Sequence, residues 1–174
     1  MIMQTNMATI PSLVHSHRAS TVKTVFNRET TVTIEIKATP SIIWALLTNA
    51  SDFPRWNHTV ISIDGNIAPG EIIKLKSTLD PNRTFKLKVK EFHPENKLVW
   101  GDTMGNRIYS INKNENGSSL FSMSEKIGGP LFPLFAKMIP SFDNSFNQFA
   151  TDLKAEAEFK MNSKYEASND IFNT

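Results

Sequence analysis

The side chains that could carry acid–base chemistry stand on two neighbouring segments, NRIYSINK and SSLFSMSEKI, which both alternate apolar and polar residues. Between them lies KNENGSS, where Gly117 suits the left-handed position of a three-residue hairpin with a bulge, so that Asn114 opposes Ser118. Counting outward from this turn gives three pairs on one face: Ile111 with Phe121, Tyr109 with Met123, and Arg107 with Glu125. Because the first two pairs are apolar or aromatic, this face is predicted to point into the interior.

Arg107 and Glu125 are then adjacent, opposite charges inside the domain. An unpaired buried charge costs too much to expect, so the two side chains are predicted to form an ion pair. This pair has two interpretations, a structural bridge near the end of the sheet or an anchor for a polar ligand group. Acid–base catalysis in this interior would have to use Glu125, Arg107, Tyr109 or Asp102, since no inward histidine is found. We favour the structural bridge, because ion-pair networks occur without catalysis.

Other patterns with chemical potential are weaker. His15 and His17 are spaced as two metal ligands, but they have no nearby cysteine and stand in an expected leader segment. The chain has no Cys at all, which excludes a thiol nucleophile and a cysteine-ligated zinc. There is also no phosphate-binding glycine loop, nucleophile elbow or His/Glu metal motif. We therefore expect no metal and no cofactor.

Length and charge limit the class of protein. The 174 residues correspond to one domain, and 19 Lys and Arg against 17 Asp and Glu give a net charge of only +2. Lysines at alternating positions of 74–76 and 86–90 predict a basic outer face without interleaved aromatic residues, so nucleic-acid binding is not expected. No apolar run approaches the roughly 20 residues of a membrane span. We expect no stable membrane insertion, a cytoplasmic location, and a monomer or homodimer.

The order of elements predicts an α+β fold. TVTIEIKA alternates as a strand, TPSIIWALLTN has an N-cap threonine and Pro40 at the start of a short helix, and ASDFPRWN forms a second helical turn. About six consecutive strands follow, and one long helix ends the domain. A curled antiparallel sheet of six to seven strands must then wrap around this C-terminal helix, a helix grip that leaves room for a cavity.

The terminal segment 130–159 contains six phenylalanines and three prolines. Phe146, Phe149 and Leu153 fall on one helical stripe and are predicted to pack on the sheet. Pro140 predicts a break, with a short helix at about 132–138 before the long one. The residues before the break, which include Phe135 and Met138, are predicted either to form the mouth of a cavity or to join the core.

Two stretches, IEIKATPSIIWALLTNASDFPRWN and MSEKIGGPLFPLFAKMIP, resemble motifs of the START-like superfamily of helix-grip domains. The similarity is to the polyketide cyclase/dehydrase and lipid-transport group, often called SRPBCC, and it covers about residues 31–160. The order of elements predicts one domain at 31–162, and composition predicts a poorly ordered leader at 1–30 and a polar tail at 163–174. The resemblance implies a cavity for an apolar ligand, but no particular reaction, since the superfamily includes carriers, sensors and enzymes.

Three functions stay open. The first, which we favour, is binding or transport of a small hydrophobic molecule such as a lipid, isoprenoid or polyketide-like compound. The second is a cyclase or dehydratase acting in the same cavity, and the third is a partner-binding module, which would expose an apolar patch. Eleven residues are predicted to line the ligand site, with Phe135 or Met138 near its mouth: Trp56, Leu75, Phe85, Leu87, Trp100, Arg107, Tyr109, Met123, Glu125, Phe135 and Met138.

Overall fold

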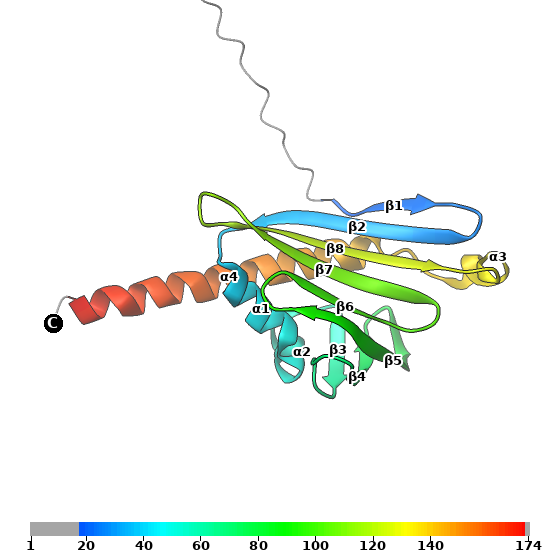
Figure 1. Cartoon of the computed structure of the whole chain (residues 1–174), viewed down its shortest axis with the longest axis horizontal. Helices are drawn as coiled ribbons and strands as arrows, with labels where there is room; N and C mark the ends of the chain where they lie inside the picture. Colours follow the sequence, from blue (N-terminus) through cyan, green and yellow to red (C-terminus); the bar gives the residue numbers. More distant parts are fainter. Residues whose placement is uncertain (1–17, 173–174) are drawn as a thin grey trace, which may run out of the picture.

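A computed structural model describes residues 18–172 as one antiparallel sheet with a long helix across it (Figure 1). The sheet has eight strands in the order β1-β2-β8-β7-β6-β5-β4-β3. Their bounds are β1 Ser20–Lys23, β2 Asn27–Ile36, β3 Val60–Asp64, β4 Ile72–Ser77, β5 Asp80–His93, β6 Lys97–Gly101, β7 Gly105–Lys113 and β8 Ser119–Gly128. The α+β prediction and its antiparallel sheet are confirmed, with one strand more than expected.

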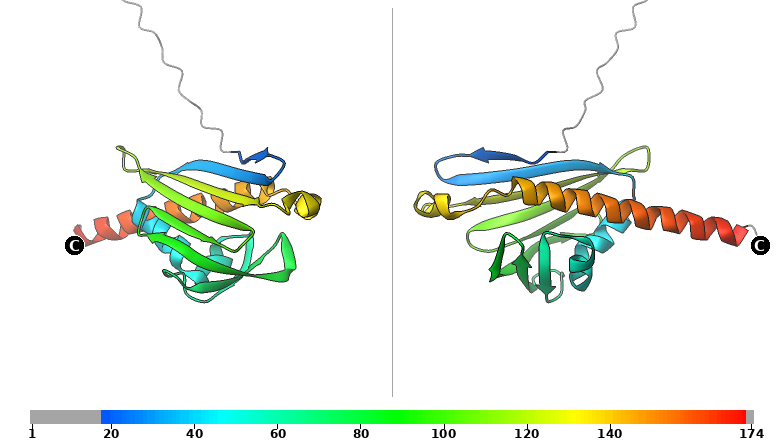
Figure 2. Two further views of the ribbon diagram at one scale, coloured as in Figure 1. Left: turned by 45° about the vertical axis from the view of Figure 1, so that its right-hand side comes forward. Right: turned by 180° about the vertical axis from the view of Figure 1, so that it is seen from behind.

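The helices follow the predicted order. Their bounds are α1 Pro40–Thr48, the 3-10 turn η1 Ala50–Asp52, α2 Phe53–Trp56, α3 Phe132–Phe135, the 3-10 turn η2 Ala136–Met138, and α4 Asp143–Phe172. The break at Pro140 is confirmed, because the chain is extended at Ile139 and α4 starts only at Asp143. Figure 2 shows α4 lying across one face of the sheet and continuing beyond it at the C-terminal end.

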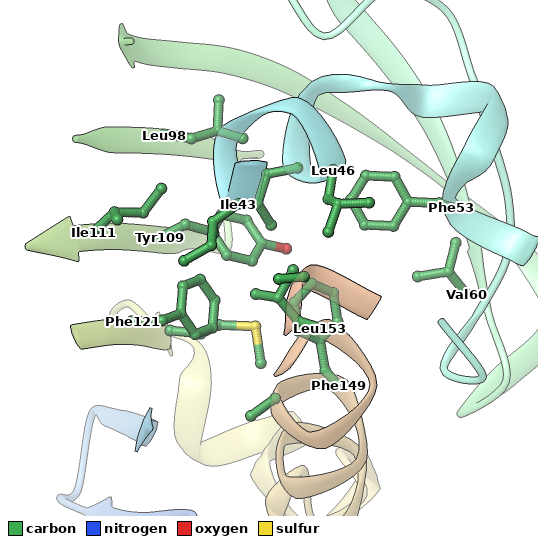
Figure 3. Close-up of a cluster of buried hydrophobic side chains, with 14 of the residues drawn as sticks. Ile43, Leu46, Phe53, Val60, Leu98, Tyr109, Ile111, Phe121, Phe149 and Leu153 are labelled. Atoms are coloured by element: carbon green, nitrogen blue, oxygen red, sulfur yellow. The ribbon is translucent and has the colours of Figure 1, made fainter. Parts of the chain in front are cut away.

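The buried stripe of α4 explains why this helix is held. Phe146, Phe149, Leu153 and Ala157 are each exposed by 1% or less and pack against the inner side of the sheet. Phe149 lies at the centre of an aromatic cluster, with its ring 5.8 Å from Trp56 and 5.7 Å from Tyr109. Figure 3 shows this part of the core between α1, α2, α4 and the strands.

The hairpin register predicted from Gly117 is confirmed. Gly117 has φ +84°, and the Asn114 backbone N–H donates to the Ser118 carbonyl over 2.9 Å. The cross-strand pairs are those expected from counting: Ile111 with Phe121, Tyr109 with Met123, and Arg107 with Glu125. The two charges therefore lie on the inner face, as predicted.

The sheet starts earlier than the sequence indicated. We expected the first strand at residue 31, but β2 begins at Asn27 and β1 pairs with it along its free edge. Thr21 and Thr30 share a hydroxyl–hydroxyl hydrogen bond of 2.8 Å, and the Ala19 N–H donates to Asn147 Oδ1 over 2.6 Å. These contacts order residues 19–30 against the body of the domain. Residues 1–17 of the leader expected at 1–30, with His15 and His17, lie outside the described residues.

The C-terminal end also differs from expectation. We expected a polar tail from residue 163, but α4 continues as a helix to Phe172. Beyond the sheet the helix leaves Phe159 and Tyr165 exposed. Within residues 18–172, no helix is long and apolar enough to span a bilayer.

Candidate functional site

A cavity of about 210 Å³ opens at the end of the sheet where α4 begins. We call it the end cavity, and its lining is mostly apolar. Seven of the predicted ligand-binding residues line it: Leu75, Phe85, Leu87, Trp100, Arg107, Glu125 and Met138. The strands β4, β5 and β6 supply one wall, and the segment between η2 and α4 supplies the other.

Alternation along β5 explains the apolar wall. Phe85 and Leu87 are half-buried and face the cavity, while Lys86 and Lys88 between and after them are exposed on the outer face. Phe85 pairs with Leu75 of β4 across the sheet, which places two apolar side chains side by side. The Arg83 guanidinium lies 4.7 Å from the centre of the Phe85 ring and covers its outer end.

The polar end of the cavity is the Arg107–Glu125 pair. Arg107 Nε donates to Glu125 Oε2 over 2.5 Å, and a second guanidinium nitrogen contacts the same oxygen. Each side chain is 18% exposed, so the pair is largely buried but still reaches solvent. The Arg107 guanidinium also lies 5.2 Å above the Phe146 ring of α4. Burial is the largest single influence and lowers the pKa of Arg107, but the charge and hydrogen bond of Glu125, together with Tyr109, outweigh it and hold the pKa above its usual value.

Two buried aromatic residues beside this pair have unsatisfied polar groups. Trp100 Nε1 and the Tyr109 hydroxyl form no hydrogen bond of good geometry with any described residue, and the two rings lie 5.0 Å apart. Burial raises the pKa of Tyr109, although the Arg107 charge nearby acts in the opposite direction. Tyr109 therefore stays protonated at neutral pH and is a poor general base. Trp100 lines the cavity, and its indole N–H is a buried donor without a partner among the described residues.

The mouth segment of the cavity is held by an arginine that sequence reasoning missed. Arg28, 6% exposed, donates to the Ile139 carbonyl over 3.2 Å and to the Pro140 carbonyl over 2.8 Å. Its guanidinium also lies 4.6 Å from the centre of the Phe142 ring. Burial lowers the pKa of Arg28, while Glu125 and another nearby carboxylate act against that change. The available signal was the alternation of Arg28 with inward residues of β2.

Four predicted residues lie away from the end cavity. Trp56, Tyr109 and Met123 are at most 5% exposed and belong to the packed core, where Tyr109 stands between Phe121 and Phe149 (Figure 3). Phe135 packs edge-on against Phe132 of α3, with ring centres 5.6 Å apart. Alternation indicated correctly that Tyr109 and Met123 point inward, but the middle of the domain is filled rather than open. A ligand role for any of the eleven residues stays a prediction.

The described part of the chain contains no cluster of three or more metal-ligating side chains. The nearest arrangement to a catalytic pair is His58 with Asp152, whose Nδ1 and Oδ1 atoms lie 3.1 Å apart. Asp152 also accepts the His58 backbone N–H over 2.8 Å, and the His58 ring is mostly exposed. These contacts attach the start of β3 to α4, outside the end cavity.

Solved structures share this fold. A protein from Nitrosomonas europaea matches with a TM-score of 0.59 at 12% identity, over 80% of this chain and 98% of that chain. A START superfamily protein from Mycobacterium smegmatis matches with a TM-score of 0.55 at 15% identity, over 75% of this chain and 97% of that chain. A conserved protein of unknown function from Enterococcus faecalis matches with a TM-score of 0.58 at 14% identity, over 78% of this chain and 74% of that chain. The curated proteins give no match.

The fold and its cavity define a START-like helix-grip domain, as the sequence motifs predicted. A family model described as polyketide cyclase / dehydrase and lipid transport matches residues 27–158, and the chain belongs to this family. The structural likenesses, all at low identity, establish the fold alone.

Proposed function

We propose that this protein binds or carries a small hydrophobic molecule in the end cavity. The observation that carries the proposal is the pairing of an apolar wall, formed by Leu75, Phe85 and Leu87, with one charged couple at the inner end. Ligand cavities are commonly apolar with a few convergent polar groups, and this arrangement fits that description. The family membership agrees with it.

The size of the cavity supports a small ligand. Its volume of about 210 Å³ is below the roughly 300–1,000 Å³ typical of sites for drug-sized molecules. A short-chain or single-ring compound fits this space. A larger ligand requires the mouth segment, Met138 to Phe142, to move outward.

The polar groups of the cavity support binding rather than catalysis. Arg107 and Glu125 already satisfy each other, and Tyr109 is protonated and packed away from the cavity.

Leu87→Trp, compared with Lys88→Trp, tests the proposal. The first substitution fills the cavity, whereas the second adds the same indole to the outer face of the same strand. Isothermal titration calorimetry with octanoate is expected to give saturable binding that Leu87→Trp weakens by about tenfold and Lys88→Trp leaves unchanged. Equal binding by both variants, or no saturable binding by the parent protein, contradicts the proposal. The heat of binding is the readout, so the added tryptophans do not affect it.

A further inference from the structure

The end of the sheet where the end cavity opens also exposes apolar side chains. We call it the loop end, and it consists of the β1–β2 turn (24–26), the β4–β5 turn (78–79), the β6–β7 turn (102–104) and the segment 129–142. Six of the twelve large hydrophobic side chains that are exposed in the described residues lie in three of these parts: Val25, Phe26, Met104, Leu131, Leu134 and Met138. In Figure 1 and Figure 2, α3 and the β1–β2 turn project together from this end.

Hydrogen bonds join these parts into one surface. The Gly129 N–H donates to the Phe26 carbonyl over 3.0 Å, which attaches the segment before α3 to the β1–β2 turn. The Gly128 N–H donates to the Met104 carbonyl, also over 3.0 Å, which attaches the β6–β7 turn. The exposure of this surface is high, with Leu134 at 79% and Met138 at 82%. Monomeric soluble proteins rarely leave such apolar groups gathered without a binding partner.

A second hollow beside this surface carries positive charge. It has a volume of about 560 Å³ and lies between β1, β2 and the α3–η2 segment. Lys23, Arg28 and Lys137 line it, against the single carboxylate of Asp143. That carboxylate already accepts hydrogen bonds from the Thr21 hydroxyl over 2.5 Å and the Ser141 hydroxyl over 3.0 Å.

The buried cation in this hollow, Arg28, has no direct ion-pair partner among the described residues, although Glu125 and Asp143 act on it from a distance. Among the described residues, no carboxylate lies within ion-pair distance of Arg28, whose guanidinium is held by two backbone carbonyls. Lys23 and Lys137 are exposed at the edge. Carboxylates of Asp80 and Asp102 stand on the far side of the end cavity, so the positive side of the loop end is the one that carries α3.

We infer that the loop end docks on the surface of an anionic lipid bilayer, with α3 and the β1–β2 turn inserted at the level of the head groups. Exposed Leu and Phe side chains beside lysines are the composition of surfaces that lie in the membrane interface. The charge is complementary to lipid phosphate, and lysines near such a surface add to binding. In this orientation the mouth of the end cavity faces the bilayer. Docking goes beyond the proposed function and does not require it.

Flotation of the full chain with vesicles tests the docking surface. The parent protein is expected to float with vesicles of phosphatidylcholine and phosphatidylglycerol more than with phosphatidylcholine alone, and less as salt is raised. Leu131→Glu with Leu134→Glu is expected to lower the partition coefficient about tenfold or more, because it replaces inserted side chains by anions. Ile72→Glu, at a 60% exposed position on β4, is the matched control and leaves binding unchanged. Lys23→Gln with Lys137→Gln is expected to lower the ratio of binding to anionic vesicles over neutral vesicles by about tenfold.

Several results overturn the inference. They are no flotation of the parent protein, flotation that Leu131→Glu with Leu134→Glu leaves intact, or an equal loss in Ile72→Glu. Size-exclusion chromatography tests whether a second copy of this chain or another protein binds this surface. The surface is assigned to a protein partner instead if the parent protein does not bind vesicles but forms a dimer, or a complex with another protein, that the paired substitutions dissociate. Thermal melting confirms that each variant is folded, and octanoate binding in solution is unaffected by the paired variant, so docking and ligand binding fail or succeed separately.

Discussion

Replacing Glu125 by Gln removes one charge from the largely buried pair and leaves Arg107 facing a neutral amide. Removing one partner of a fully buried ion pair commonly costs about 3–5 kcal/mol. Here each of the two side chains is 18% exposed, and the amide oxygen of the introduced Gln still accepts a hydrogen bond from Arg107. We therefore expect a loss of about 2 kcal/mol in the free energy of unfolding. For a chain of 174 residues, this corresponds to a fall in Tm of about 4–8 °C.

The assay is thermal melting of Glu125→Gln beside two further variants. Glu29→Gln, on the neighbouring strand β2 and outside the interior, is expected to change the unfolding free energy by less than about 0.5 kcal/mol. Replacing the pair together, Arg107→Met with Glu125→Leu, is expected to recover most of the lost stability, because no unpaired charge remains. Octanoate binding by folded Glu125→Gln is expected to persist.

The result that refutes this reasoning is an unchanged Tm for Glu125→Gln. The pair then contributes nothing to the fold, and the hypothesis that Glu125 serves as a catalytic acid or base gains support. In that case the variant keeps its fold and ligand affinity but loses turnover by about 10²-fold or more.

Three further outcomes are expected. Arg55 forms ion pairs that lower the pKa of Asp52 and Glu156 below their ordinary values of 3.8 and 4.5, so this stabilisation is present above those values and lost as the pH falls through the lowered ones. In urea unfolding, the free energy of unfolding of Arg55→Gln is expected to be lower than that of the parent by up to about 1 kcal/mol at pH 7 and equal to it at pH 2. A difference that is the same at both pH values contradicts this. Gly101→Ala is expected to cost about 2–3 kcal/mol, because its Cβ falls 2.1 Å from the Gly105 carbonyl oxygen, and a parent-like Tm argues against that contact. A chain ending before α4 is expected to be insoluble, since the inner face of the sheet loses its cover, and a soluble, folded product argues against this role of the helix.

Sequence patterns predicted the strands and their register because both depend on local rules. The left-handed glycine at Gly117 determined how the hairpin closes, and the period of two then determined which side chains face inward. The proline break before α4 also follows from a local restriction at Ile139. The edge strand β1 escaped prediction because STVK has no apolar alternation, and its pairing depends on the free edge of β2 and on contacts with α4.

The candidate site was predicted only in part, for a different reason. Alternation tells which side chains point into the domain, but it does not tell where the crossing helix fills the interior. Phe149 fills the space around Trp56 and Tyr109, whereas the sheet beyond the start of α4 leaves a gap at Leu87. Arg28 was missed because its partners are backbone carbonyls at Ile139 and Pro140, which no sequence pattern reveals.

The most direct test of ligand binding uses the indole N–H signals of the three tryptophans in a ¹⁵N NMR titration with octanoate. Trp100 lines the end cavity with an unpaired N–H, whereas Trp44 of α1 packs against Phe92 at a ring distance of 4.9 Å, away from the cavity. Occupation of the cavity is expected to shift the Trp100 signal in a saturable way and leave the Trp44 signal in place. A Trp100 signal that does not move at saturating octanoate, or a larger shift at Trp44, contradicts the assignment of the end cavity as the ligand site.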